Sequence, residues 1–402
     1  MHRFVPWALV ALCFALGVAS RAVLDCFTVF VPALEHEFSA SRSAITLVYS
    51  FGLMSSMAAP LAGLIADRLG LRTLSLIGIG AAAAGTAAAS FATEIWQLYL
   101  GIGLLLGFGG VAVGAVPSSI IVSRWFPAQR MGVPMAVAWS SAGVGVMLLL
   151  PIAQRLIADD GWRHAYRVAA VFSAAFLPLL LVLPWRRIEA GITGAARART
   201  SGGAGPTVAQ ALRDWPFWAL AASFALTSLG IFAIFPQSMV YLLERGLDGG
   251  YAARALAVAG VLTPLGMVGF SWLADRGGRK LAAIMAYLCS IGGVGALALV
   301  RGPEDTVFLW LYVLLFGGSM GSRGPMISAL ATMRYRGAQF GRIYGLISIG
   351  TGVGGFLGAW IGGLLHDLTD GYAWVMVFAA CSLAVACTTL GAEAGARERL
   401  SR

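Results

Sequence analysis

The chain has 402 residues, of which 59% are hydrophobic and only 11% are charged. Soluble globular domains carry roughly 25% charged residues, so this composition excludes a soluble protein and indicates one that lies in a lipid bilayer. The net charge of +10 at pH 7 therefore needs an explanation that suits a membrane protein.

Twelve apolar segments follow one another along the chain, each near or above the ~20 residues with which a helix crosses a bilayer. In chain order they cover residues 5–34, 44–66, 73–92, 96–122, 131–157, 166–185, 215–241, 252–274, 281–300, 307–331, 343–365 and 373–392. Because lipid offers no hydrogen-bond partners, such runs must form helices. A β-barrel would instead show short segments of alternating hydrophobicity. The predicted fold class is an all-α membrane protein with twelve transmembrane helices in two six-helix halves.

The only sizeable polar interruption, residues 186–214, is rich in Gly, Ala, Arg and Ser and is predicted to be a flexible linker. It divides the chain into an N-terminal six-helix bundle (1–187), a linker (188–213) and a C-terminal six-helix bundle (214–402). With the N-terminus inside, 19 of the 28 Lys and Arg residues fall in cytoplasmic segments and seven on the other side. This bias predicts that both termini and the linker are cytoplasmic, in a bacterial-type inner membrane. The positive charge then faces anionic lipid headgroups and is no argument for a nucleic-acid partner.

A charged turn in the first half recurs in the second. Residues 63–72 read Gly-Leu-Ile-Ala-Asp-Arg-Leu-Gly-Leu-Arg, and residues 275–280 read Asp-Arg-Gly-Gly-Arg-Lys. Asp67 and Asp275 are 208 positions apart in a chain of 402, and each follows the second span of its half. A polar turn repeated at about half the chain length indicates two related halves.

Six spans, a linker and six more spans, with these two turns, resemble the major facilitator superfamily over essentially the whole chain. The first turn matches the family pattern Gly-x-x-x-Asp-Arg-x-Gly-x-Arg in full, whereas Ser271 stands where the second would begin with glycine. The resemblance implies that the turns brace the inward-closed state through charge contacts with neighbouring helix ends. The residues given this gating role are Asp67, Arg68, Arg72, Asp275, Arg276 and Arg279. The alternative is that these charges only set the topology.

A narrower resemblance, to monocarboxylate and oxalate/formate transporters, rests on two stretches. They are Phe27-Thr28-Val29-Phe30 followed by Glu37-Phe38-x-x-Ser41-Arg42-Ser43, and Arg124-Trp125-Phe126 followed by Arg130-x-Gly132 and Ala138-x-x-x-Ala142-Gly143-x-Gly145. The chain departs from the animal monocarboxylate carriers at three points. Their acidic-Gly-aromatic signature is absent, Asp25 stands in place of a lysine, and Met267 stands in place of an arginine. Details of the substrate therefore cannot be carried over.

Three ionisable residues lie away from the membrane surfaces, namely Arg21 and Asp25 in the first span and Arg323 in the tenth. Each costs about 2.5–3.5 kcal/mol at the bilayer centre, so we expect all three to face a polar interior. The resemblance agrees, since both spans line the family's central cavity. Arg21 and Asp25 are one helical turn apart and can pair, whereas Arg323 has no acidic residue in a span left to pair with it. A transported anion is the simplest counterion for that surplus charge, because a guanidinium can bind a carboxylate with two hydrogen bonds.

Two alternatives remain open for these charges. Arg21 and Asp25 can pair with each other and do no more than rigidify the first span. Arg323 can extend to the cytoplasmic rim or hydrogen-bond to backbone. Asp25 is also the predicted proton-coupling residue, since no Lys, Glu or His lies in a span. Further candidate substrate-binding residues around Arg21 and Arg323 are Tyr49, Ser118, Ser119, Trp139, Ser140, Thr227, Phe232, Gln237, Tyr241, Tyr344 and Ser348.

The sequence therefore predicts a secondary active transporter of a small, monocarboxylate-like organic anion that works by alternating access with proton symport. The alternatives are an anion exchanger of the oxalate/formate type, an exporter of drugs or metabolites, and, in a different class, a non-transporting membrane sensor. We expect no enzyme, cofactor or metal site, because the four histidines do not cluster and no phosphate-loop motif is present. The expected partners are the anion, a proton and the lipid bilayer, and the expected state is a monomer.

Overall fold

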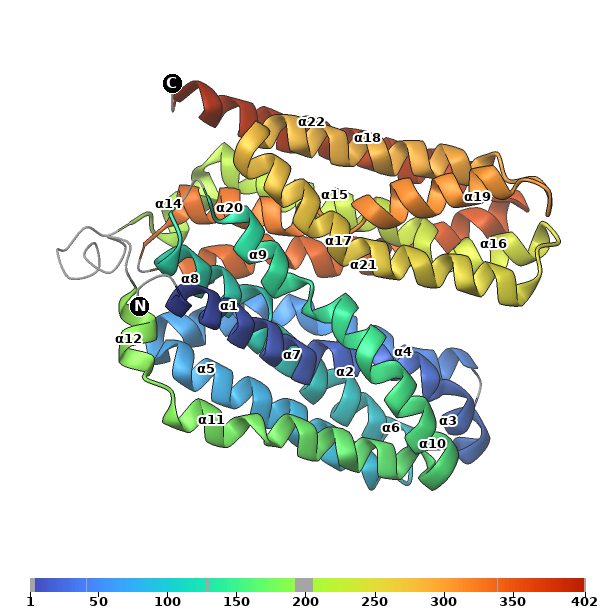
Figure 1. The fold of residues 1–402 in the computed structure, drawn as a ribbon, viewed down its shortest axis with the longest axis horizontal. Helices are drawn as coiled ribbons and strands as arrows, with labels where there is room; N and C mark the ends of the chain where they lie inside the picture. The colour runs from blue at the N-terminus through green and yellow to red at the C-terminus, as the bar shows by residue number, and fades with distance from the viewer. Residues whose placement is uncertain (1–3, 41, 128–129, 192–204, 338, 401–402) are drawn as a thin grey trace. The chain divides into compact units, whose positions relative to one another are not determined.

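The computed structural model describes residues 4–40, 42–127, 130–191, 205–337 and 339–400, and these form helices without any strand. The middle of the predicted linker, residues 192–204, lies outside the described residues, as do Ser41 and both chain ends. Figure 1 shows the helices as long rods that run side by side within each part of the chain. Where a helix changes to a π or 3-10 turn, the short segment is labelled η.

Before the linker the described residues form long helices interrupted by short π and 3-10 turns. Their segments are α1 (Phe4–Gly17), η1 (Val18–Ala22), α2 (Val23–Asp25), η2 (Cys26–Val29), α3 (Val31–Phe38), α4 (Arg42–Met54), η3 (Ser55–Ala58), α5 (Ala59–Ser90), α6 (Ile95–Leu98), η4 (Tyr99–Leu106), α7 (Gly107–Val113), α8 (Ala115–Trp125), α9 (Gly132–Trp139), α10 (Ser141–Ala174), α11 (Phe176–Val182) and α12 (Trp185–Ala190).

After the linker a short helix, α14, precedes a second series of long helices. The segments are α14 (Val208–Arg213), α15 (Trp215–Ile234), η6 (Phe235–Gln237), α16 (Ser238–Glu244), α17 (Gly249–Gly277), α18 (Arg279–Ala298), α19 (Thr306–Tyr312), η7 (Val313–Gly317), α20 (Arg323–Tyr335), α21 (Phe340–Thr369) and α22 (Ala373–Leu400).

Nine helical stretches of the described chain are long and apolar enough to cross a membrane. Two of them are too long for one crossing, and each is divided at a glycine with non-helical backbone angles, Gly70 (φ 87°) in α5 and Gly161 (φ 83°) in α10. Glycine suits both joints, because positive φ is unfavourable for other residues. A shorter apolar helix, Thr306–Gly317, continues into α20 after a break. With these divisions the observed helices are consistent with the twelve predicted spans.

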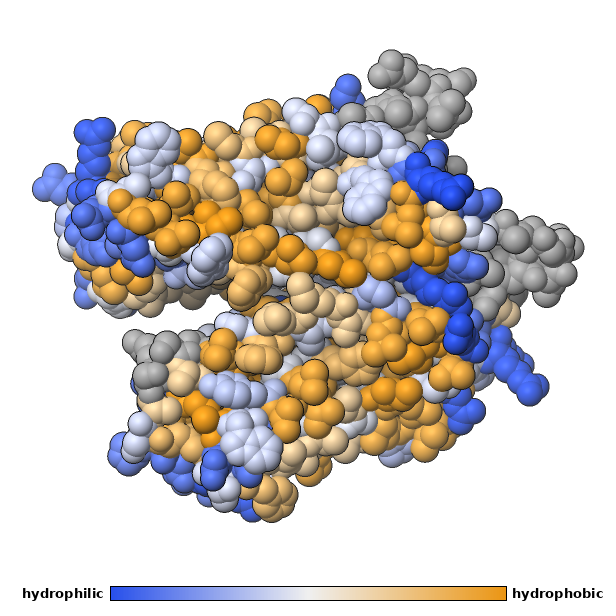
Figure 2. All heavy atoms as spheres, turned by 180° about the vertical axis from the view of Figure 1, so that it is seen from behind, coloured by the Kyte–Doolittle hydropathy of each residue, from blue (hydrophilic) through white to orange (hydrophobic). Residues whose placement is uncertain are grey.

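The surface follows the same pattern. On the visible face, Figure 2 shows hydrophobic side chains along the middle of the helices and charged side chains gathered at their ends. Many large apolar residues are exposed in this protein, among them Leu104, Leu148 and Leu265. Such a surface is stable against lipid and not against water, as expected for a multi-pass membrane protein.

Contacts divide the chain into two compact units. Unit 1 comprises Met1–Ala128, Val137–Val208 and Thr332–Leu346, and unit 2 comprises Gln129–Ala136, Ala209–Ala331 and Ile347–Arg402. Each unit thus contains one sequence half together with a short segment from the other half. Each of these segments includes the first residues of a helix, α9 in unit 2 and α21 in unit 1.

Candidate functional site

The first cluster joins the two ionisable residues of the first span. Arg21 Nε donates to Asp25 Oδ2 at 2.9 Å, and the side chains are 31% and 18% exposed. Tyr49 of α4 donates its hydroxyl to the other carboxylate oxygen of Asp25, at 3.0 Å. The predicted pairing of Arg21 with Asp25 is therefore present, and the structure adds Tyr49 as a direct partner of the carboxylate.

The helix is irregular where this cluster lies. Arg21 is in the π turn η1, and Asp25 immediately precedes the 3-10 turn η2. Gly110 of α7 lies next to Arg21, since a Cβ built on that glycine would be in van der Waals contact with the arginine Cα at 3.7 Å. Irregular turns inside membrane helices occur where a span must present polar groups to a protein interior, and π turns are frequent at functional sites.

The second cluster surrounds Arg323, whose side chain is wholly buried. Its Nη1 donates to the Ala286 carbonyl and to Ser290 Oγ, both at 2.8 Å, and its Nη2 donates to the Met320 carbonyl at 3.2 Å. The guanidinium carbon lies 5.1 Å from the ring centroid of Tyr287. All these partners are neutral. Among the described residues no carboxylate pairs with Arg323, and its Nε has no acceptor.

The tenth span is broken next to this arginine. Residues 320–322 form a turn between η7 and α20, and Arg323 is the first residue of α20. The break leaves carbonyl groups without helical donors, and Arg323 satisfies that of Met320. Broken helices near the midplane are characteristic of ion and substrate sites in transporters.

A chain of hydroxyls extends from Arg323. Tyr287 shares a 2.6 Å hydrogen bond with Thr227 of α15, and Ser290 shares one of 2.6 Å with Ser319. Thr227 was a predicted site residue, whereas Tyr287 and Ser290 of α18 were not. Hydropathy predicts the ninth span as an apolar run, and the signal in it for a polar site is the pair Tyr287 and Ser290, which are three positions apart and share one helix face.

The other predicted residues occupy varied positions. Ser118 and Ser119 are buried in α8, and Ser140 donates to the Val137 carbonyl at 2.8 Å. The indole N–H of Trp139 is buried without a partner among the described residues. In unit 2, Phe232 and Gln237 face glycines of α21, and Ser348 is buried in that helix.

Two of the predicted tyrosines are buried and contact neighbouring groups. Tyr241 donates to the Val300 carbonyl at 2.9 Å, and Tyr344 stacks on Phe340 with 5.7 Å between ring centroids. Their proposed roles in binding substrate stay predictions, as do those of the other predicted residues. No group of three His, Cys, Asp or Glu side chains in the described ranges could hold a metal ion.

The repeated turns each place a carboxylate at the start of a helix. Asp67 accepts from the backbone N–H groups of Gly341 and Arg342 at 3.2 and 3.0 Å, and the Arg342 side chain lies 3.8 Å away. Asp275 accepts from the N–H groups of Gly132 and Val133, at 3.2 and 3.1 Å. A carboxylate in this position satisfies unpaired helical donors and complements the helix dipole. The predicted contacts of the turns with helix ends are thus present for both aspartates.

The arginines of the turns are arranged differently. Arg68 and Arg72 are exposed, Arg276 lies over the Trp272 ring at 4.8 Å, and Arg279 is half-buried. Their gating role stays a prediction.

Comparison with known proteins identifies the family. The sequence profile of the Major Facilitator Superfamily matches residues 8–336. The chain belongs to this superfamily. Membership makes it a membrane transporter and not an enzyme, and it accounts for the repeated turns at Asp67 and Asp275.

Within the superfamily the chain resembles monocarboxylate transporters, as the sequence predicted. It is 27% identical to monocarboxylate transporter 12-B of Danio rerio, over 88% of this chain and 80% of the relative. It is also 27% identical to monocarboxylate transporter 13 of Rattus norvegicus, over 95% and 89% of the two chains.

Solved structures of the superfamily share the fold. The proton:xylose symporter XylE, bound to 6-bromo-6-deoxy-D-glucose, aligns with a TM-score of 0.77 at 15% identity, over 96% of this chain and 95% of XylE. A single-residue variant of the Escherichia coli fucose:proton symporter FucP aligns with a TM-score of 0.75 at 16% identity, over 98% and 99% of the two chains. At these identities the similarity shows the superfamily fold alone.

The leading glycine of the first superfamily turn gives a direct test of packing. A Cβ on Gly63 would overlap the Gly341 carbonyl, whereas a Cβ on Gly80, in the part of α5 that follows Gly70, would meet nothing within 4 Å. Gly63→Ala is expected to lower the free energy of unfolding by about 1–3 kcal/mol, as overpacking does. Gly80→Ala, the matched control, is expected to be neutral or to stabilise by less than about 1 kcal/mol. Denaturant titration of the purified protein in detergent measures both, and equal effects would contradict this account.

The carboxylate of the same turn gives a second test. Asp67→Ala removes the acceptor for two helix N–H groups and is expected to cost about 1–2 kcal/mol of stability, whereas Asp67→Asn retains an acceptor and should cost less. Asp159→Ala, which removes an exposed carboxylate, is the control. Thermal unfolding of the three variants measures the difference. An Asp67→Ala variant as stable as the control would show that the two hydrogen bonds contribute nothing.

Proposed function

We propose that this transporter carries a small organic anion of the monocarboxylate class and couples it to protons by alternating access. The observation that carries the proposal is the surplus charge at Arg323, which is fully buried among neutral hydrogen-bond acceptors. A buried cation without an acidic partner is costly, and an anion that approaches it lowers that cost. The similarity to proteins named monocarboxylate transporters favours a carboxylate as that anion.

Arg21 supplies the more accessible contact in this proposal. Its side chain is partly exposed and bound to a single carboxylate, so a substrate carboxylate can compete with Asp25 for the guanidinium once Asp25 takes up a proton. Tyr49 then becomes available as a donor to the substrate. Arg323 is covered in this conformation, and the break at residues 320–322 is the place where the span can bend to expose it.

The position of Met267 favours a substrate site whose positive charge lies elsewhere than in the animal monocarboxylate carriers. Met267 occupies the position where those carriers place an arginine in the eighth span, and its methyl carbon lies 2.6 Å from where a Cβ on Gly321 would be. Met267 therefore lies beside Gly321 of the tenth span, and Arg323 follows Gly321 by two residues. We infer that the positive charge of the site is provided by the tenth span here.

The wider organisation follows the superfamily. We propose two six-helix halves, residues 1–187 and 214–402, joined by a linker over residues 188–213, with both termini in the cytoplasm of a bacterial-type cell. The excess of Lys and Arg on one side of the spans supports this orientation. Asp67 and Asp275 hold the turns closed against helix starts in one conformational state and release them in the other.

Uptake into proteoliposomes tests the proposal. The purified chain is reconstituted and given labelled monocarboxylates, dicarboxylates, aromatic acids and neutral sugars, with and without an inward proton gradient. We expect monocarboxylate uptake that the gradient accelerates. Acceleration by internal anion alone would identify an exchanger, and transport of the sugars without the acids would overturn the proposed substrate class.

A further inference from the structure

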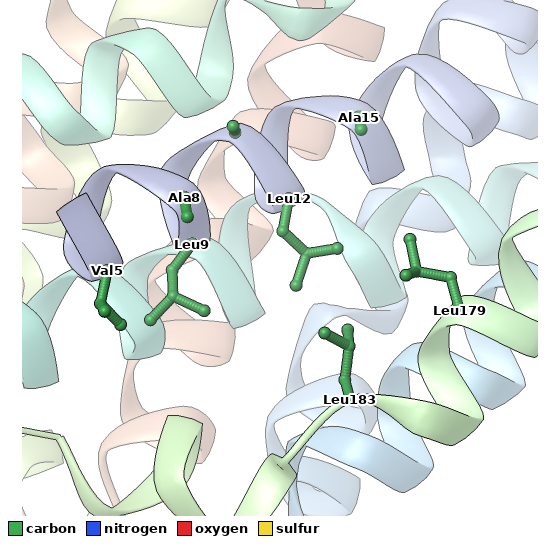
Figure 3. A pocket seen from close by; sticks show the side chains of 8 residues that line it. Val5, Ala8, Leu9, Leu12, Ala15, Leu179 and Leu183 are labelled. Atoms are coloured by element: carbon green, nitrogen blue, oxygen red, sulfur yellow. The ribbon is translucent and has the colours of Figure 1, made fainter. Parts of the chain in front are cut away.

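An apolar groove lies within unit 1, between α1 and α11 with the residue that follows it. Its volume is about 420 Å³. Six residues of α1 between Val5 and Ala15 form one wall, and Leu179 and Leu183 form the other. Figure 3 shows Val5, Leu9 and Leu12 extending from α1 to the side where Leu179 and Leu183 lie, and the side chains drawn contain only carbon atoms. Among the described residues only apolar side chains line the groove, so it suits a hydrocarbon occupant.

The length of the groove corresponds to one leaflet of a bilayer. The wall from Val5 to Ala15 spans ten helical steps, which is about 15 Å at a rise of 1.5 Å per residue. The hydrocarbon core of a bilayer is about 30 Å thick, so half of it is about 15 Å. Since the groove begins in the second residue of α1, it reaches from the end of that helix to the middle of the span.

A basic helix lies at the same end of the unit. α12 begins two residues after Leu183 and buries Trp185 and Ile188 while it exposes Arg186 and Arg187. Trp125, the last residue of α8, donates its indole N–H to the Ile188 carbonyl at 2.8 Å. The start of α1 lies at this end too.

Two further contacts define that end. Trp7 of α1 packs edge-on against Phe126 at 5.6 Å, directly after α8. The one acidic residue of α12, Glu189, is engaged elsewhere, because it accepts from the Leu71 N–H at 2.7 Å. The exposed charge of α12 is therefore that of its two arginines.

We propose that this groove and α12 together bind one anionic glycerophospholipid. An acyl chain lies between α1 and α11 along the groove, and Arg186 and Arg187 bind the phosphate and the rest of the charged headgroup. Three observations favour this ligand over a neutral lipid or a peptide. They are the charge complementarity, the leaflet length of the groove, and the position of the arginines at its end. This site is independent of the proposed transport function.

Native mass spectrometry of the purified full chain tests the site with dioleoyl phosphatidylglycerol and dioleoyl phosphatidylcholine. We expect tighter binding of phosphatidylglycerol. The double variant Arg186→Gln/Arg187→Gln should weaken phosphatidylglycerol binding about tenfold and leave phosphatidylcholine binding unchanged. The control, Arg213→Gln/Arg301→Gln, removes two exposed arginines elsewhere and should leave both affinities within about twofold of the original.

Filling the groove provides the second measurement. Ala8 is exposed and lines the groove, so Ala8→Phe is expected to weaken binding of both lipids without changing the helical content measured by circular dichroism. Three results would each overturn the proposal. They are equal affinity for the two lipids in the original chain, equal effects of the two double variants, and unchanged lipid binding by Ala8→Phe.

Discussion

Replacing Arg323 with glutamine is expected to lower uptake of the transported anion about 10- to 100-fold, the amount that loss of one or two hydrogen bonds to a charged group predicts. Glutamine removes the surplus charge and cannot reach Ala286, Ser290 and Met320 together, as the planar guanidinium does. Uptake of labelled monocarboxylate into proteoliposomes, at equal amounts of reconstituted protein, measures the effect.

The control for this prediction separates charge from structure. Arg323→Lys keeps the positive charge and loses the fork geometry, so it should transport better than Arg323→Gln and bind anion with reduced affinity. If both variants fold, lose all transport and still bind the anion with unchanged affinity, Arg323 serves only to satisfy the broken tenth span. Normal uptake by Arg323→Gln would remove the surplus-charge argument altogether.

The second large effect is expected at Asp25. Asp25→Asn is expected to abolish the acceleration of uptake by an inward proton gradient, because the amide cannot exchange a proton in the physiological pH range. Asparagine still accepts a hydrogen bond from Tyr49, so the local packing should survive. Exchange of internal for external anion should persist, since it needs no net proton movement. Uptake with and without the gradient, together with counterflow, measures both quantities.

Tyr49→Phe is the companion variant for Asp25. It keeps the ring, which stacks on Phe27 with 6.3 Å between centroids, and removes only the hydroxyl that donates to the carboxylate. We expect reduced uptake with the proton dependence retained. Proton-driven uptake by Asp25→Asn at the original rate would show that the proton is carried elsewhere.

The order of the spans could be predicted from the sequence because lipid imposes one strong constraint on every segment. Hydropathy separates the rods, and charged turns mark where they end, so Gly70 and Gly161 lie in the predicted loops. The chemistry of the first span was predictable for a similar reason. Arg21 and Asp25 are the only ionisable pair in that helix away from its ends, and their spacing leaves one obvious partner for each.

Packing between distant segments could not be predicted in the same way. Hydropathy does not show which face of a helix meets which neighbour, so Tyr287 and Ser290 were overlooked in an apolar run although both lie beside Arg323. The sequence also did not show that each unit includes a short segment from the other half of the chain. This arrangement depends on contacts such as that of the Asp67 carboxylate with the Gly341 N–H, which no single-sequence pattern reveals.

Each unit includes a short segment from the other half of the sequence, and this limits how the two halves can change in evolution. Gly63 must stay small because of Gly341, and Ser271 is tolerated where its carbonyl faces Gly132. Each half of the sequence therefore carries a surface that is matched to a segment of the other, and neither can accumulate substitutions alone. A chimera that joins residues 1–187 of this transporter to the C-terminal half of a distant homologue should be defective until the residues at these two meeting points are matched.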